Sequence, residues 1–173
     1  MLFLVLLAGG VLWSVLNGMP FINDLRAKWE AQRLQDQWEK PYREDTYGGK
    51  TPEETYDLFL DALRKGDTTL ASRYFVIEKQ EQWFKTLEEY KKQNLLANFV
   101  KELENNRKIW TKLPPSDDPL FKDTESYGYS VVIKNGTTAN IDGQKVNIPA
   151  GTYDNETEFQ LNTYTKIWKV SIL

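Results

Sequence analysis

Three patterns of hydrophobic and polar positions follow one another along the chain, and each predicts a different kind of element. Residues 1–23 carry no ionisable side chain, and the first charge is Asp24. From about residue 51 to residue 110 the apolar positions recur at helical spacing, and from residue 127 onward they recur at every second position. This order predicts an α+β fold, in which helices pack on one face of a curved antiparallel sheet.

The uncharged run at residues 1–23 is long enough to cross a bilayer, because a helix of roughly 20 residues spans the hydrocarbon core. We therefore expect a transmembrane anchor and contact with the lipid bilayer. A cleaved signal peptide is the weaker alternative, since no Lys or Arg precedes the run and Ala8-Gly9-Gly10 would place the cleavage site very early. A buried soluble helix is the third reading, although such helices rarely lack a polar face.

Residues 24–48 predict a helical tether that ends in a linker. The segment is free of glycine and proline up to Pro41, and Gly48-Gly49 then interrupts the pattern. Its apolar side chains fall on two faces at 100° per residue, which indicates contact with two neighbours, either a protein partner or a second copy. Tryptophan at a membrane interface is an alternative explanation. The candidate tether contacts are Leu25, Trp29, Leu34 and Trp38.

The helical half of the remaining chain begins at residues 51–54. Here a threonine can cap the first amides, a proline suits the first turn and a glutamate completes a capping box. Gly66 ends this helix, and Asp67 begins a second, short one. A longer helical region is expected over about residues 78–110, with a break near residues 91–94.

The second half predicts strands. Tyr127, Tyr129, Val131 and Ile133 alternate with smaller or polar residues, which is typical of a half-buried strand. Asn135-Gly136 predicts a turn, and Asp142-Gly143 predicts a tight hairpin. Two further strands are expected over residues 157–161 and 168–172, with Thr157, Phe159 and Leu161 inward on the first and Trp168, Val170 and Ile172 inward on the second.

Composition excludes several kinds of chemistry. The chain contains no cysteine and no histidine, which removes disulfides, thiol catalysis, most zinc sites and every mechanism that needs imidazole. The net charge is −3 with both signs interspersed, so nucleic-acid binding is not expected. The sequence has no phosphate loop, dinucleotide fingerprint or metal-ligand spacing, and we expect neither a cofactor nor a metal.

Two segments resemble the NTF2-like superfamily. TPEETYDLFLDALRKGDTTLASRYF, residues 51–75, is similar to the opening helices of that superfamily, and FQLNTYTKIWKVSIL, residues 159–173, is similar to its closing hairpin. The resemblance implies that residues 49–173 form a cone of helices on a bent sheet, with a pocket between them. The side chains that it implies line this pocket are Tyr56, Tyr127, Tyr129, Phe159 and Trp168.

Function is less determined than fold. An isomerase-like pocket would need a tyrosine donor and a buried carboxylate, for which Asp61 and Glu158 are conceivable beside the tyrosines. The pair Asp57 and Asp61 is better explained as solvated, and so are Glu156 and Glu158. The leading hypothesis is a membrane-anchored, non-catalytic domain that binds a partner or ligand at the cell envelope. Its alternatives are a scaffold subunit that resembles those of type IV secretion systems and a pocket enzyme of the isomerase or dehydratase type.

The side of the membrane on which the domain lies is open to two interpretations. Between Asp24 and Arg43 the tether holds five basic and four acidic residues, and the positive-inside rule would keep the domain in the cytoplasm. Resemblance to anchored NTF2-like domains favours the outside, and we expect a single-pass protein with an extracytoplasmic domain.

Overall fold

The structure, a computed structural model, describes the backbone of residues 2–141 and 144–173 and the side chains of residues 23–138 and 145–173. It divides the chain into two compact units, Met1–Glu44 and Asp45–Leu173. The second unit thus begins four residues before the boundary expected at Gly48-Gly49. The expected hairpin turn at Asp142-Gly143 lies outside the described residues.

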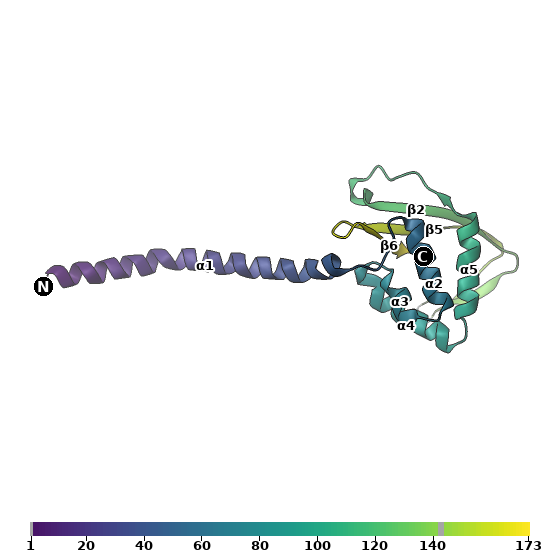
Figure 1. The fold of residues 1–173 in the computed structure, drawn as a ribbon, viewed down its shortest axis with the longest axis horizontal. Coiled ribbons are helices and arrows are strands. Elements are labelled where there is room, and N and C mark those ends of the chain that lie inside the picture. Colours follow the sequence, from purple (N-terminus) through teal and green to yellow (C-terminus); the bar gives the residue numbers. More distant parts are fainter. Residues whose placement is uncertain (1, 142–143) are drawn as a thin grey trace. The chain divides into compact units, whose positions relative to one another are not determined.

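The first unit is one helix, α1 (Leu2–Glu44), shown in purple and blue in Figure 1. It includes the expected tether and continues through Pro41, because a proline in the last turn removes only one amide donor. Among the side chains that the structure describes, no helix has an apolar stretch sufficient to cross a membrane. The expected anchor at residues 1–23 falls, apart from Asn23, on positions whose side chains are not described.

The second unit opens with two short helices whose ends match the sequence signals. Helix α2 (Pro52–Arg64) is capped by Thr51, whose Oγ1 accepts the amide of Glu54 at 3.2 Å. The Glu54 carboxylate accepts the amide of Lys50 at 2.6 Å, one residue before the position that a capping box predicts. Gly66 follows the helix with φ +68°, and Asp67 caps α3 (Thr68–Arg73).

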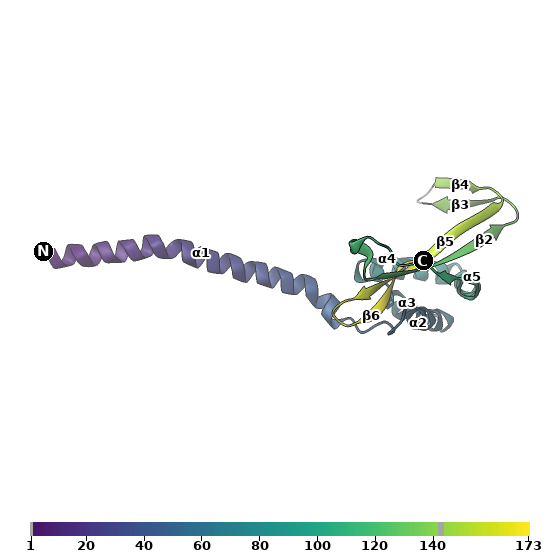
Figure 2. The same ribbon diagram turned by 90° about the horizontal axis from the view of Figure 1, so that it is seen from above.

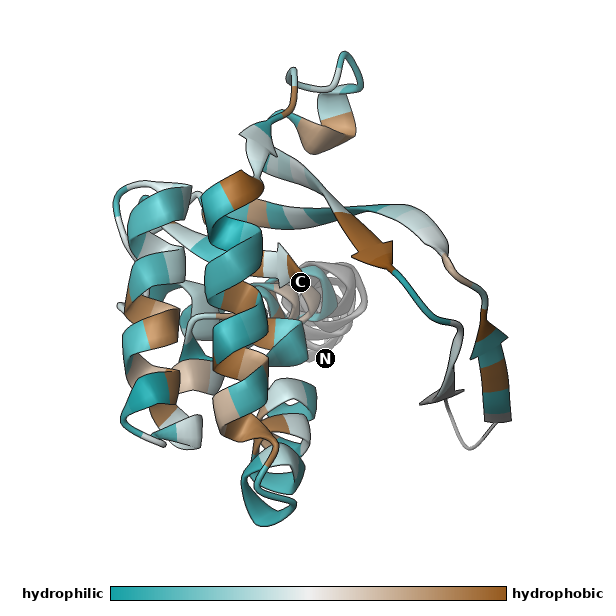
Figure 3. Cartoon of the chain, turned by 90° about the vertical axis from the view of Figure 1, so that its right-hand side faces the viewer, coloured by the Kyte–Doolittle hydropathy of each residue, from teal (hydrophilic) through white to brown (hydrophobic). Residues whose placement is uncertain are grey.

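A 3₁₀ turn, η1 (Ile77–Lys79), leads into α4 (Gln80–Lys92) and then α5 (Leu96–Ile109). The expected break between the two longer helices is present, with Asn94 at φ 59°. Helix α3 packs between α2 and α4, while α2 contacts β6 and α5 contacts β2. In Figure 3 the helices lie to one side, and brown hydrophobic bands alternate with teal along them.

The main sheet has the order β1-β2-β5-β6, and every pair of neighbours is antiparallel. A hairpin of two further strands lies at the far end of β2 and β5 (Figure 2). A 3₁₀ turn, η2 (Pro119–Phe121), interrupts the loop before β2. The strands are β1 (Thr111–Lys112), β2 (Thr124–Ile133), β3 (Thr137–Ile141), β4 (Gln144–Ile148), β5 (Gly151–Asn162) and β6 (Ile167–Ile172). The expected α+β class is confirmed.

The hydrophobic core lies between the helices and one face of the sheet. Phe59 of α2, Leu87 of α4 and Phe75, which follows α3, are completely buried there, together with Phe159 and Val170 from the sheet. The alternation expected for β2 and β5 is present, since Tyr127, Thr157 and Phe159 are buried. Strand β5 begins six residues earlier than expected, because its outer half forms a ribbon with β2 whose side chains are mostly exposed.

The last strand is covered on both faces. Val170 is buried in the core and Trp168 packs against it half-buried, whereas Ile172 is exposed. Lys169 and Ser171, on the other face, are buried as well. Residues 45–49 cover Lys169 together with the carbonyl group of Arg73, and Lys79 donates to the Ser171 carbonyl.

Candidate functional site

The interior between helices and sheet is filled by aromatic side chains. The Trp110 ring lies 4.8 Å from Tyr56 and 4.5 Å from Tyr127, measured between centroids, and 6.0 Å from Phe159. Tyr56, Tyr127 and Phe159 are each at most 3% exposed. The guanidinium of Arg107 closes the cluster above Trp110, 4.3 Å from the ring centroid. Tyr56, Tyr127 and Phe159 are therefore part of the hydrophobic core, and Trp110 packs against it.

Two hydrogen bonds between polar side chains lie beside this cluster. The Tyr127 hydroxyl donates to Glu53 Oε1 at 2.5 Å, and the Lys112 ammonium donates to Glu125 Oε2 at 2.5 Å. Burial, followed by the hydrogen bond to Glu53, raises the pKa of Tyr127. Desolvation raises the pKa of Glu53, but the hydrogen bonds that this carboxylate accepts outweigh it, and its pKa lies below the ordinary 4.5. The tyrosine is therefore a hydrogen-bond donor at neutral pH.

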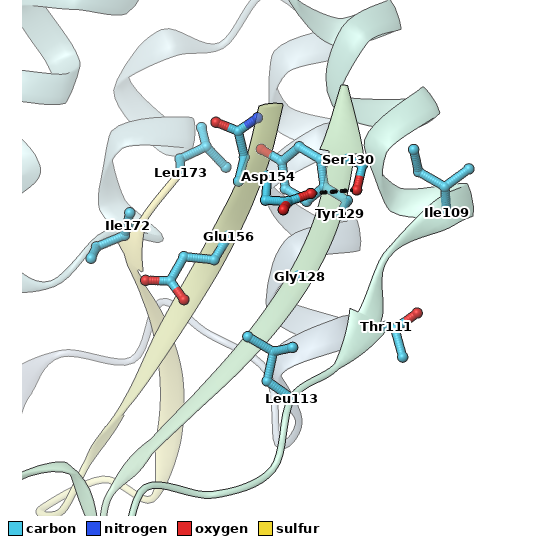
Figure 4. A pocket seen from close by; sticks show the side chains of 11 residues that line it. Ile109, Thr111, Leu113, Gly128, Tyr129, Ser130, Asp154, Glu156, Ile172 and Leu173 are labelled. Carbon is cyan, nitrogen blue, oxygen red and sulfur yellow. Dashed lines mark hydrogen bonds between the residues drawn. The ribbon is translucent and has the colours of Figure 1, made fainter. Parts of the chain in front are cut away.

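An open cleft of about 820 Å³ lies where β1, β2, β5 and β6 come together (Figure 4). Ser130 and Asp154 are directly paired across β2 and β5, and so are Gly128 and Glu156. Figure 4 shows the hydrogen bond from Ser130 Oγ to Asp154 Oδ1, which is 2.6 Å long. The residues lining the cleft are Ile109, Thr111, Leu113, Gly128, Tyr129, Ser130, Asp154, Asn155, Glu156, Ile172 and Leu173.

A second cleft of about 700 Å³ shares Leu113 and Glu156 with the first. It extends to Trp168 and Leu161 and is bounded by the loop that carries Phe121. The two clefts thus meet at Leu113. The Leu113 side chain covers Gly128, because a Cβ on Gly128 would lie 3.0 Å from Leu113 Cδ2.

The charged side chains that line the first cleft are all of one sign. Asp154 and Glu156 are exposed, and none of the eleven described lining residues is basic. Glu156 has no ion pair among the described side chains, which include all of its neighbours in the cleft. Aliphatic side chains of Ile109, Leu113 and Ile172 form its walls. The cleft therefore offers negative charge beside apolar surface.

The structure separates the five side chains that the resemblance implied as a pocket lining. Tyr56, Tyr127 and Phe159 belong to the core, whereas Tyr129 lines the first cleft and Trp168 the second. Asp57 and Asp61 are solvated, as expected, and pair with Arg107 and Arg64 at the surface. Glu156 is exposed, while Glu158 is half-buried and accepts the Ser171 hydroxyl at 2.8 Å.

The tether residues lie on α1 with large exposed fractions. Trp29 is 76% and Trp38 is 75% exposed, and Leu25 and Leu34 are exposed as well. Among the described residues, no group of acidic side chains is arranged to hold a metal ion.

Sequence reasoning missed the ion pair between Lys169 and Asp45. Both side chains are buried, and the Lys169 Nζ donates to Asp45 Oδ2 at 2.6 Å and to the carbonyl oxygens of Tyr47 and Arg73 at 2.6 Å. Desolvation lowers the pKa of Lys169, against the opposing effect of Asp45. Period-two alternation places a lysine between Trp168 and Val170 on the outer face, and no local signal indicates that this face is covered.

Comparison of the chain with models of protein families, with curated proteins and with solved structures finds no match.

Proposed function

We propose that this chain is a membrane-anchored, non-catalytic domain of NTF2-like type that binds a partner at the cell envelope. The order of helices followed by an antiparallel sheet supports the NTF2-like part of the proposal. The uncharged run of residues 1–23 supports the anchor. The outward orientation of the domain rests on its resemblance to anchored NTF2-like domains, against the positive-inside rule.

The observation that carries the proposal is the contrast between the two faces of the sheet. A pocket enzyme of the isomerase type would need space beside its tyrosine donor, but the rings of Tyr56, Trp110 and Tyr127 fill that space. The open clefts lie outside the core, where side chains of β2 and β5 meet solvent. Recognition of another macromolecule fits an open surface of this kind better than turnover of a small molecule does.

Photo-crosslinking tests where a partner binds. A benzophenone amino acid placed at Val132, on the outer half of β2, should give a discrete adduct in cells that express the full chain naturally. The same group at Lys85, which is exposed on α4, is the matched control and should give none. No adduct from Val132, or equal adducts from both positions, would contradict the proposal.

The anchor is tested separately. Full-length protein should sediment with membranes and require detergent for extraction. Protease added to intact cells or spheroplasts should digest the domain. Recovery of the intact chain in the aqueous fraction would remove the anchor from the proposal, and protection until lysis would reverse the orientation.

A scaffold subunit of a secretion-type envelope assembly is the second candidate, and the exposed tether residues favour it. Trp29 and Trp38 project from faces of α1 roughly 180° apart at 100° per residue, so one neighbour cannot cover both. The chain has no cysteine, and a single Glu30→Cys variant therefore reports contacts between copies without background. Disulfide-linked dimers in membranes would support this candidate, and monomers alone would count against it.

A further inference from the structure

The long ribbon formed by β2 and β5 has an unpaired edge beside the first cleft. Strand β1 pairs only with Tyr127 and Gly128, although β2 continues to Ile133. The Leu113 amide extends the pairing by donating to the Ser126 carbonyl at 2.8 Å. Alternate residues of an antiparallel strand direct both backbone groups to the same side. The backbone groups of Ser126 and Gly128 point toward β1. Those of Ser130 and Val132 therefore point to the same edge of β2, past the end of β1, where no described strand pairs with them.

The strand at this edge itself lacks the features that usually prevent pairing, although the end of α5 at Ile109 lies beside it in the first cleft. Natural edges are protected by proline, by charged side chains or by a covering segment. Residues 129–133 read Tyr-Ser-Val-Val-Ile, without proline or charge, and the Val132 side chain is 63% exposed. The sequence is also rich in residues that favour strands. This edge can therefore pair with another strand.

The neighbouring carboxylates determine which strand fits. Asp154 and Glu156 project on the same face as Ser130, and no lining residue of the first cleft carries a compensating positive charge. A strand added at Ser130 would place alternate side chains over this face. A second copy pairing through the same edge would present Ser126, Gly128, Ser130 and Val132 on this face, with Lys134 just beyond them as its one cation, and would match at most one of the two carboxylates. Charge complementarity therefore selects a different chain that is basic at these positions.

We propose that the edge of β2 at Ser130 and Val132 receives an extended segment of a partner protein with lysine or arginine at alternate positions. The proposal rests on the partner-binding function inferred above and names the chemistry of that partner. Backbone hydrogen bonds from Ser130 and Val132 supply the pairing. The ammonium or guanidinium groups reach Asp154 and Glu156, while their methylene stems pack on the aliphatic walls at Ile109 and Leu113.

The test uses full-length protein in detergent micelles and a fluorescein-labelled octapeptide of alternating lysine and valine. Fluorescence anisotropy at low ionic strength should show saturable binding, and a peptide with glutamate in place of lysine should not bind. Glu156→Lys should weaken binding by at least about tenfold. Glu30→Lys changes the net charge equally on α1 and should alter the affinity by less than about twofold.

A third peptide separates strand pairing from simple charge attraction. Methylation of alternate backbone nitrogens keeps every side chain but removes the donors on one edge, and it should weaken binding by at least about tenfold. Undiminished binding of this peptide, equal effects of the two charge reversals, or absence of saturable binding would each overturn the inference. If Val132 still gives its photo-adduct in such a case, the partner-binding function stands and only the chemistry of the partner is wrong.

Discussion

The Nζ of Lys169 lies 2.6 Å from Oδ2 of Asp45, and both groups are almost completely withdrawn from solvent. The pair joins the first residue of the second unit to its last strand. Two backbone carbonyls, of Tyr47 and Arg73, accept the other protons of the ammonium group. Every donor of this buried cation is therefore satisfied, as burial requires.

Lys169→Met should lower the free energy of unfolding by about 3–5 kcal/mol, because it leaves the Asp45 carboxylate buried without its counter-ion and with only the Tyr47 amide as a hydrogen-bond donor. Urea denaturation measures the change. Lys134→Met, at an exposed lysine in the same unit, is the control and should stay within about 0.5 kcal/mol. Combining Lys169→Met with Asp45→Leu should recover part of the loss. Equal midpoints for Lys169→Met and Lys134→Met would show that the pair contributes nothing.

The same pair determines where a soluble fragment has to begin. A fragment of residues 43–173 keeps Asp45 and should fold, whereas a fragment of residues 49–173 leaves Lys169 without its counter-ion and without the Tyr47 carbonyl. We expect the shorter fragment to be less stable by about 3–5 kcal/mol. Comparison of their urea midpoints checks this, and coincident transitions would place the boundary at Gly49 after all.

The contact between Tyr127 and Glu53 should appear in the pH dependence of stability. The pKa of Glu53 is lowered in the folded protein, so its contribution is present above pH 4.5 and is lost as the pH falls. The pKa of Tyr127 is raised, so its contribution is complete below pH 10.0 and is lost as the pH rises further. Tyr127→Phe should therefore flatten both limbs of the profile. Denaturation midpoints from acid to alkaline pH measure this, and unchanged limbs would contradict it.

The loss of stability caused by a core substitution should follow the burial of the side chain rather than its size. Phe159→Ala should cost about 3–5 kcal/mol, because the ring is completely buried among other rings. Trp168→Ala should cost less, since that indole is only half-buried. Asp57→Ala, at an exposed position on α2, should stay within about 0.5 kcal/mol. A larger effect at Trp168 than at Phe159 would contradict the packing described here.

Gly48→Ala should destabilise the entrance of the second unit. A Cβ on Gly48 would lie 2.4 Å from the carbonyl oxygen of Trp168, which accepts the Thr55 hydroxyl at 2.9 Å. Relief of this clash requires a backbone shift, with a cost of roughly 1–3 kcal/mol. Gly136→Ala is the control, because its nearest atom would be 3.4 Å away. Equal thermal midpoints for the two variants would exclude the clash.

The sequence predicted those features that depend on neighbouring residues. Thr51, Gly66 and Asp67 end or begin helices through local hydrogen bonds, and the structure has all three. The two-residue strand β1 escaped prediction, because so short a strand is defined only by its pairing with Tyr127 and Gly128. Periodicity identifies a strand only when several residues alternate.

Burial by segments that are distant along the chain could not be predicted from the sequence either. Lys169 is covered by Asp45, Tyr47 and Arg73, which precede it by 124, 122 and 96 positions, and alternation alone places it in solvent. The first cleft arises where β1 and β6 end beside the longer β2 and β5, which depends on strand lengths and register. Tyr129, expected in an internal pocket, lines this cleft. Trp110, taken only as the end of a helical region, packs against Tyr56 and Tyr127 in the core.

The buried pair at Asp45 also has a mechanical consequence. Tension applied through α1 enters the second unit at residue 45, and the ion pair carries it directly into β6, 124 residues further along the chain. The bridge between Gly49 and Trp168, with its 2.9 Å hydrogen bond, lies on the same route. The load thus reaches the sheet without passing through helices α2 to α5. A force applied through α1 can therefore pull on the domain while its outer strands remain in place.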